Sequence, residues 1–189
     1  MPLGRDLRAL AWCRRTWVLG VPMGVALTGL AGCANRPPPA ADATDLAGRM
    51  ILQIGGTPSQ PARQWSAGFE LRGTARAGEL DLTSPLGTLV AQARWQPGMV
   101  ELSQGAERLR FDSLPDLARQ LLGEAVPLEA LFDWLRGRPE PQAPHEVTNS
   151  GFLQQGWDVD LTGLAAGTFT ARRTSEPTIT LRARLEGAP

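Results

Sequence analysis

The sequence contains no lysine, one histidine and two cysteines, and these absences exclude several kinds of chemistry. A zinc site needs several histidine or cysteine ligands, which the chain does not supply. No Ser-His-Asp triad fits, because the single histidine, His145, lies in a proline-rich loop. Asp158 and Asp160 share one strand face and offer a carboxylate pair for acid–base work, but a solvated face partnered by arginine is the favoured interpretation. We therefore expect no enzyme, no metal and no cofactor.

Positive charge comes from arginine alone, and the sequence contains no basic cluster. Four of the 19 arginines and one of the 19 acidic residues precede position 33, so the rest of the chain carries 15 positive and 18 negative charges. A negative net charge without a basic cluster argues against nucleic-acid binding. For the same reason, we expect any membrane contact beyond a lipid anchor to be apolar rather than electrostatic.

The sequence also lacks an apolar run long enough for a membrane-spanning helix. Its uncharged apolar stretch, from Trp17 to Leu30, is shorter than the roughly 20 residues that a span requires. Four arginines precede this stretch, and the small residues Ala31 and Gly32 follow it. This order is typical of an export signal, so we predict that residues 1–32 are a signal peptide that is removed.

The end of this signal, Leu30-Ala31-Gly32-Cys33, resembles the lipobox of bacterial lipoproteins. The resemblance implies that Cys33 becomes the mature N-terminus and carries lipid on its sulfur and its amine. No aspartate follows Cys33 directly, which in such lipoproteins implies the outer rather than the inner membrane. The alternative is a generic secretory signal in which Cys33 is incidental. Since Cys13 lies within the signal, the exported domain has no disulfide.

Residues 33–45 are predicted to be a tether between the lipid and a folded domain. This segment is rich in proline and alanine and has no apolar periodicity. The run Pro37-Pro38-Pro39 favours polyproline II, a semi-rigid spacer that extends about 3.1 Å per residue. We assign residues 46–189 to one domain, whose size allows a real hydrophobic core.

Alternation of apolar and polar residues dominates this domain and predicts short antiparallel strands with one buried and one solvent-exposed face. In residues 178–185, for example, Ile179, Leu181 and Ala183 share one face, and two arginines lie on the other. The predicted strands span residues 49–54, 65–72, 79–83, 88–95, 98–103, 107–111, 152–155, 157–161, 168–172 and 178–185.

Two helices are predicted in mid-chain, over residues 112–123 and 126–137. Ser113 is a plausible N-cap of the first and Gly123 fits its C′ position, while Pro127 fits the first turn of the second and Gly137 its C′ position. A long twisted antiparallel sheet tends to curl. We therefore predict a mostly β fold, an incomplete barrel of about ten strands whose concave side is covered by a helical lid over an apolar cavity.

One leucine has no local reason to be buried. Leu86 lies between Pro85 and Gly87 in the predicted turn that joins two well-patterned strands. One interpretation is that Leu86 folds back onto the core. The other is an exposed apolar finger that enters a bilayer or contacts a lipid chain.

The chain resembles the LolB family of outer-membrane lipoprotein receptors from about residue 46 to its C-terminus. The matching segments are Gly48-Arg49, the Ser-Pro-Leu-Gly of residues 84–87, "WQPGMVEL" at 95–102 and above all "PLEALFDWLRGRP" at 127–139. The resemblance implies an open, curled sheet lidded by helices, with a hydrophobic cavity and no cofactor. It also implies that Leu86 is the exposed apolar residue of a membrane-insertion loop.

The function implied by the resemblance is to accept lipid-modified proteins from the periplasmic carrier LolA and insert them into the inner leaflet of the outer membrane. The expected partners are a LolA-like carrier, acylated lipoproteins and outer-membrane lipid, with the receptor itself a monomer. The cavity candidates are the side chains that face the interior from the strands and the lid. They are Trp65, Phe69, Leu71, Leu80, Leu82, Leu89, Trp95, Leu131, Trp134 and Leu135. For each of them, the alternative is plain core packing.

One feature departs from the family pattern, and two other functions stay open. The family usually has an amphipathic helix before the first strand, and here that helix is absent or reduced to "ATDLAG" at residues 43–48. One alternative function is a lipid-anchored scaffold whose interior is filled by its own side chains. Another is a carrier of apolar ligands that are unrelated to lipoproteins.

Overall fold

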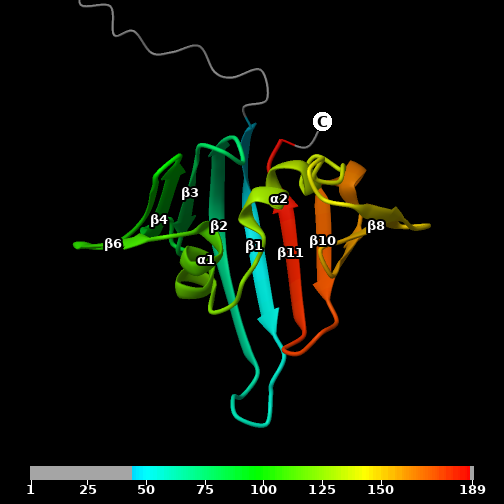
Figure 1. Cartoon of the computed structure of the whole chain (residues 1–189), viewed down its shortest axis with the longest axis horizontal. Helices are drawn as coiled ribbons and strands as arrows, with labels where there is room; N and C mark the ends of the chain where they lie inside the picture. Colours follow the sequence, from blue (N-terminus) through cyan, green and yellow to red (C-terminus); the bar gives the residue numbers. More distant parts are fainter. Residues whose placement is uncertain (1–43, 188–189) are drawn as a thin grey trace, which may run out of the picture. The chain divides into compact units, whose positions relative to one another are not determined.

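The computed structural model describes residues 44–187, which form one antiparallel sheet with two helices on one side (Figure 1). The predicted signal peptide, Cys33 and most of the predicted tether lie outside these residues. The sheet order is β6-β5-β4-β3-β2-β1-β11-β10-β9-β8-β7, so the central strand β1 joins the two halves of the chain. The strands are β1 (Thr44–Ile54), β2 (Arg63–Gly73), β3 (Gly78–Thr83), β4 (Leu89–Gln96), β5 (Met99–Gln104), β6 (Glu107–Phe111), β7 (His145–Val147), β8 (Gly151–Gln154), β9 (Trp157–Asp160), β10 (Thr168–Arg173) and β11 (Ile179–Leu185). The helices are α1 (Leu114–Leu122), α2 (Leu128–Trp134) and the short 3-10 helix η1 (Leu164–Ala166).

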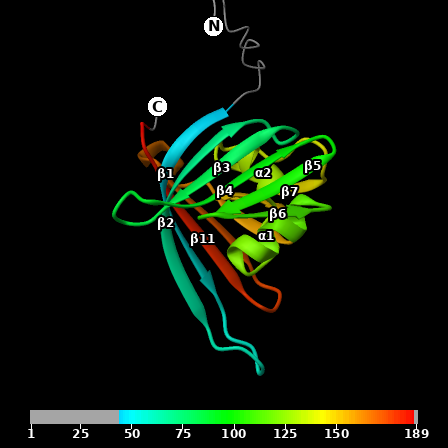
Figure 2. The same ribbon diagram turned by 90° about the vertical axis from the view of Figure 1, so that its left-hand side faces the viewer.

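The sheet curls without closing, because its end strands β6 and β7 do not pair with each other. Helices α1 and α2 lie over its concave side (Figure 2). The predicted incomplete barrel with a helical lid is therefore confirmed, with eleven strands rather than ten. Within residues 44–187, no helix is both long and apolar enough to cross a membrane.

The core follows from the alternation along the strands. In β11, Ile179, Leu181 and Ala183 are buried, whereas Arg182 and Arg184 on the other face are exposed. The same period of two in the other long strands brings the apolar side chains of sheet and helices into one cluster. Every fully buried member of that cluster lies between Met50 and Ala183, so a chain of residues 34–189 keeps the whole described core.

Helix α1 begins and ends as its sequence predicts. The Ser113 hydroxyl accepts a hydrogen bond from the backbone N–H of Asp116 over 3.3 Å, and Gly123 ends the helix in a left-handed conformation with φ 78°. Helix α2 is shorter than predicted at both ends. Pro127 is its N-cap and not its first helical residue, no side chain caps that end, and the C-cap is Leu135, so Gly137 is not its C′ residue. Burial of Leu131 and Trp134 holds α2 in place instead.

Two stretches are strands where the sequence predicts something else. Residues 44–48, where the sequence predicts the end of the tether and a helix that is absent or reduced, form the start of β1, where Leu46 lies opposite Leu71. Pairing with the equally long β2 decides the conformation of this stretch, which has too little apolar spacing for a helix. His145, predicted in a loop, lies in β7, which pairs with β8. All three residues of β7 are exposed, so the strand lacks the alternation that would reveal it.

Candidate functional site

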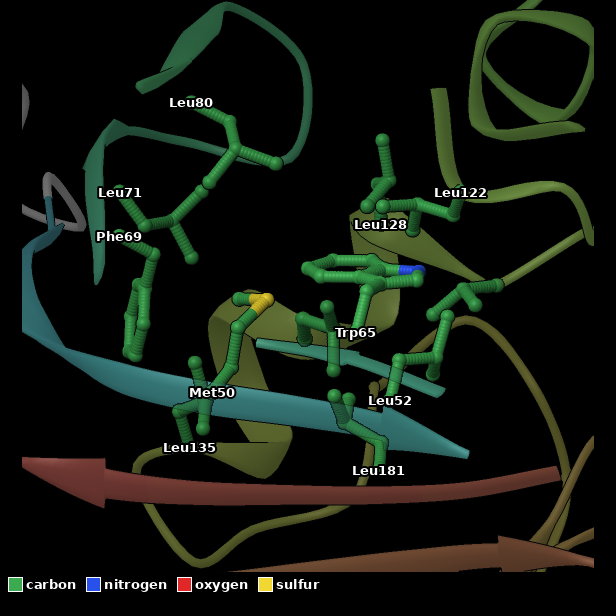
Figure 3. Close-up of a pocket in the computed structure, with 12 residues that line it drawn as sticks. Met50, Leu52, Trp65, Phe69, Leu71, Leu80, Leu122, Leu128, Leu135 and Leu181 are labelled. Carbon is green, nitrogen blue, oxygen red and sulfur yellow. The ribbon is translucent and has the colours of Figure 1, made fainter. Parts of the chain in front are cut away.

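An apolar pocket lies between the concave side of the sheet and the lid helices (Figure 3). Its lining comes from β1, β2, β3 and β11 on one side, and from α1, α2 and the segments that flank α2 on the other. The lining residues are Met50, Leu52, Trp65, Phe69, Leu71, Leu80, Leu122, Val126, Leu128, Leu131, Leu135 and Leu181. None of these side chains is charged, and the indole N–H of Trp65 is the only polar group among them.

The pocket is nearly closed in this structure. Its cavity volume is about 20 Å³, which is the space of a single water molecule. Pockets that hold small organic ligands measure roughly 300–1,000 Å³. An acyl chain therefore fits only if the lid side chains move away from the sheet.

Six of the ten predicted cavity residues line this pocket: Trp65, Phe69, Leu71, Leu80, Leu131 and Leu135. Leu82, Trp95 and Trp134 are buried elsewhere in the core. The Trp95 ring packs against Phe132 with centroids 5.8 Å apart, and its indole N–H donates a hydrogen bond to the carbonyl of Ala75.

Half of the lining was missed by sequence reasoning. Leu52 and Leu181 follow the alternation of β1 and β11, and Leu122 lies on the apolar face of α1, so their patterns mark them as buried. Whether a buried residue lines the pocket depends on how the sheet curls against the lid, which the local sequence pattern does not show.

The prediction that Leu89 faces the interior is wrong, because its side chain is 52% exposed. Ala91 pairs with Leu82, but Leu89 pairs with the very next residue of β3, Thr83. Val90 is therefore an extra, unpaired residue in a β-bulge, which reverses the alternation at the start of β4. Leu89 and Val90 both become exposed as a result.

The loop between β3 and β4 projects from the side of the sheet opposite the helices (Figure 2). Leu86 at its tip is 94% exposed. The loop is closed by two backbone hydrogen bonds, from the N–H of Ser84 to the carbonyl of Thr88 and from the N–H of Gly87 to the carbonyl of Ser84. Gly87 has φ 83°, a conformation that glycine adopts without strain. The loop therefore has a defined shape that holds Leu86 away from the core, and we call residues 84–88 the finger loop.

The two aspartates of β9 lie beside polar residues of the following turn and of β10. The Asp160 carboxylate accepts hydrogen bonds from the hydroxyl and the backbone N–H of Thr162, at 2.6 and 2.9 Å, and these bonds lower the pKa of Asp160. Asp158 lies directly opposite Arg172 on β10. In the part of the chain that the structure describes, no group of histidine, cysteine, aspartate and glutamate is arranged to hold a metal ion.

One acidic group of the lid has a shifted pKa. Glu129 lies in the first turn of α2. Although much of its side chain is exposed, partial burial of the carboxyl raises its pKa, and the negative charge of Glu140 raises it further. The lid thus carries a carboxylate whose charge the folded state disfavours.

A protein-family model described as outer membrane lipoprotein LolB matches residues 46–178. The chain belongs to the LolB family. The outer-membrane lipoprotein LolB of Chromobacterium violaceum is 36% identical over 140 residues, which cover 69% of this chain and 74% of the relative. That of Bordetella petrii is 33% identical over 171 residues, covering 85% of this chain and 84% of the relative. The resemblance noted in the sequence is therefore confirmed.

The part of the chain that matches the LolB family contains the features described above. Residues 46–178 include the finger loop, both lid helices and every residue that lines the pocket except Leu181 on β11. The exposed leucine and all but one of the pocket residues thus lie in the part of the chain that matches the family model.

Proposed function

We propose that this LolB-family chain is an outer-membrane receptor that takes the acyl chains of lipid-modified proteins from a LolA-like periplasmic carrier. It then inserts those chains into the inner leaflet of the outer membrane. The observation that carries this proposal is the apolar lining of the pocket between sheet and lid. Such a lining favours hydrocarbon and offers almost no hydrogen-bonding partner to a polar ligand.

Burial of hydrocarbon supplies the binding energy but does not set the direction of transfer. Each buried CH₂ group contributes about 0.8 kcal/mol, whether it lies in the carrier, in this chain or in the bilayer. Small differences between these sites therefore decide where the acyl chains go. The membrane is the final site because it takes up the chains without moving any lid.

Loading requires the lid to move, and α2 is the element suited to do so. Leu128 and Leu131 of α2 close the pocket, and Leu135 follows directly after the helix. The helix belongs to no strand ladder, and its N-terminus has no side-chain cap. Displacing α2 breaks no backbone hydrogen bond of the sheet. It costs side-chain packing and, where the end of the helix moves, the Trp134–Gln154 hydrogen bond, and the acyl chains restore the lost apolar contacts.

The finger loop is the part of the chain suited to delivery. The Leu86 side chain is almost fully exposed, and backbone hydrogen bonds hold its loop in shape. An exposed leucine on a structured tip can enter the hydrocarbon layer without unfolding any other part of the domain. We assign the insertion role to Pro85, Leu86 and Gly87.

The test is transfer of a lipidated protein in two separate steps. Residues 34–189 are first mixed with a LolA–lipoprotein complex, and the loaded domain is then mixed with outer-membrane vesicles. Leu86→Glu is compared with wild type and with Val147→Glu. The control residue Val147 is an 82% exposed apolar residue on the edge strand β7.

We expect all three proteins to accept the lipoprotein, because neither substitution touches the pocket. Delivery by Leu86→Glu is expected to fall about tenfold or more, since a carboxylate in hydrocarbon costs roughly 2–3 kcal/mol. Val147→Glu is expected to deliver like wild type. If wild type accepts no lipoprotein, the receptor proposal is wrong, and the scaffold with a filled interior takes its place.

A further inference from the structure

The outer face of the sheet gathers three arginines from opposite ends of the domain. Arg49 on β1 lies directly opposite Arg184 on β11, and Arg182 precedes Arg184 by two residues on the same face. All three are exposed. Met50 and Leu181, which alternate with them, line the pocket, so the arginines point away from the lid. We call these three residues the arginine cluster.

The arginine cluster lacks the acidic partners that two other arginines of the same face, Arg72 and Arg94, have. On β2 and β4, Arg72 and Arg94 form ion pairs with glutamates and an aspartate of β2 and β3. Within residues 44–187, none of the three clustered arginines forms a salt bridge, and Arg182 donates one hydrogen bond, to the side-chain oxygen of Gln53. Like charges directly opposite each other destabilise a sheet. The Arg49–Arg184 pair is therefore a like-charge pair without an acidic partner in the described part of the chain.

The arginine cluster adjoins the finger loop. Arg49 lies opposite Gly68, and Gly68 lies opposite Thr83, the residue that enters the finger loop. Gly68 has no side chain, so an open cleft of about 130 Å³ joins Arg49 to Thr83, Ser84, Pro85 and Gly87. Arg49 and the finger loop therefore border one cleft, and Arg184 extends this surface because it pairs with Arg49.

Two acidic residues also line this cleft, and neither neutralises the arginine cluster. Glu70 forms an ion pair with Arg72. Glu186 is exposed, its backbone N–H donates a hydrogen bond to the carbonyl of Ala47, and its carboxylate lies beyond ion-pair distance of the three arginines. The surface around Arg49 and Arg184 keeps a positive excess on a chain whose net charge beyond the signal is negative.

We propose that Arg49, Arg182 and Arg184 bind the phosphate groups of anionic phospholipids and seat the domain on the bilayer that Leu86 enters. The proposal rests on the membrane-delivery function proposed above. Guanidinium groups match phosphate oxygens in charge and in fork geometry. With Leu86 in the hydrocarbon, arginines at the base of the finger lie at headgroup depth, an arrangement that combines apolar and electrostatic membrane binding. Membrane contact is then not purely apolar, contrary to the expectation from the negative net charge and the lack of a basic cluster in the sequence.

The test is vesicle binding by residues 34–189 without carrier or cargo, so its outcome does not depend on the receptor function. Cosedimentation is measured with vesicles of phosphatidylcholine alone and with vesicles that also contain phosphatidylglycerol. The double variant Arg49→Gln/Arg184→Gln is compared with Arg108→Gln/Arg110→Gln on the edge strand β6. The two variants lose the same charge, and the control breaks one ion pair, in which the exposed Arg110 lies 3.7 Å from Glu101.

We expect wild type to bind the vesicles with phosphatidylglycerol more tightly and to lose this preference in high salt. The cluster variant is expected to lose about fivefold in affinity per arginine, the ratio that corresponds to about 1 kcal/mol each. The β6 control is expected to bind like wild type. Because the cluster variant removes a like-charge pair, it is expected to unfold at no lower urea concentration than wild type.

Equal losses in the cluster variant and the β6 control would overturn the proposal, since net charge alone would then govern binding. The same holds if wild type binds both kinds of vesicle equally. If the cluster variant binds vesicles normally but accepts less cargo from the carrier, the arginines contact an acidic protein instead of lipid. Failure of wild type to accept any cargo contradicts the receptor function and leaves the vesicle result intact.

Discussion

The indole N–H of Trp134 donates a hydrogen bond to the side-chain oxygen of Gln154 over 2.7 Å, in the interior of the domain. Gln154 is only 2% exposed. Its side-chain oxygen also accepts from the backbone N–H of Glu140, and its amide N–H groups donate to the carbonyls of Glu140 and Ala143. A single side chain on β8 thus holds both the end of α2 and the proline-rich segment that follows it.

Replacement of this glutamine is expected to destabilise the lid and the fold together. Gln154→Ala leaves an indole N–H, a backbone N–H and two carbonyls without partners, so we expect the free energy of unfolding to fall by roughly 3 kcal/mol. Urea denaturation followed by circular dichroism measures this. Gln96→Ala, at an exposed position on β4, is the matched control and is expected to change the value by less than about 0.5 kcal/mol. A loss in Gln154→Ala no larger than in the control would contradict the anchoring role.

Trp65 is expected to report the entry of an acyl chain into the pocket. It is the only tryptophan among the pocket residues, whereas Trp95, Trp134 and Trp157 are buried outside the lining. A brominated fatty acid quenches a tryptophan that it touches. We therefore expect strong quenching in wild type and in Trp157→Phe, and little in Trp65→Phe. Quenching that survives in Trp65→Phe would place the ligand elsewhere.

Glu129 is expected to make the stability of the domain depend on pH. Partial burial, helped by Glu140, raises the pKa of Glu129 above its ordinary value of 4.5 in the folded state. As the pH rises from the ordinary pKa to the raised pKa of the folded state, the Glu129 carboxyl loses its proton first in the unfolded chain. The free energy of unfolding therefore falls over this interval. Glu129→Gln removes this loss.

The variant Glu129→Gln is therefore expected to be more stable than wild type at neutral pH and to lose that advantage in acid below about pH 4.5. Urea denaturation at a series of pH values measures the difference. Glu107→Gln on the exposed strand β6 controls for the change in net charge. An advantage for Glu129→Gln that grows toward acid would show that the sign is wrong.

Much of the sheet was predictable because strand and helix signals are local. Ile179, Leu181 and Ala183 alternate with arginine and were correctly assigned to the buried face of their strand. The cap residues Ser113 and Gly123 marked the ends of α1 for the same reason. The orientation of Leu89 was mispredicted, because a bulge depends on how β4 pairs with β3 and not on the sequence of β4 alone.

The functional site was predictable only in part. Leu86 stood out because a leucine between proline and glycine in a turn is unusual. The turn sequence did not decide whether its side chain packs onto the core or is exposed. Gln154 gave no signal, since a glutamine in a short strand is ordinarily exposed and its four hydrogen-bond partners are contributed by the lid region. Only packing distinguishes such a residue from its exposed neighbours.

By itself, the sequence determined the antiparallel strands and the two mid-chain helices, and it predicts the export signal and the lipidation motif, because each depends on residues close together in the chain. Tertiary structure decided which apolar side chains line the pocket and that the pocket is closed. It also decided that Arg49 and Arg184 lie opposite each other beside the finger loop. The reason is the pairing of β1 with β11, which joins the first strand to the last and brings into contact residues that no local pattern connects.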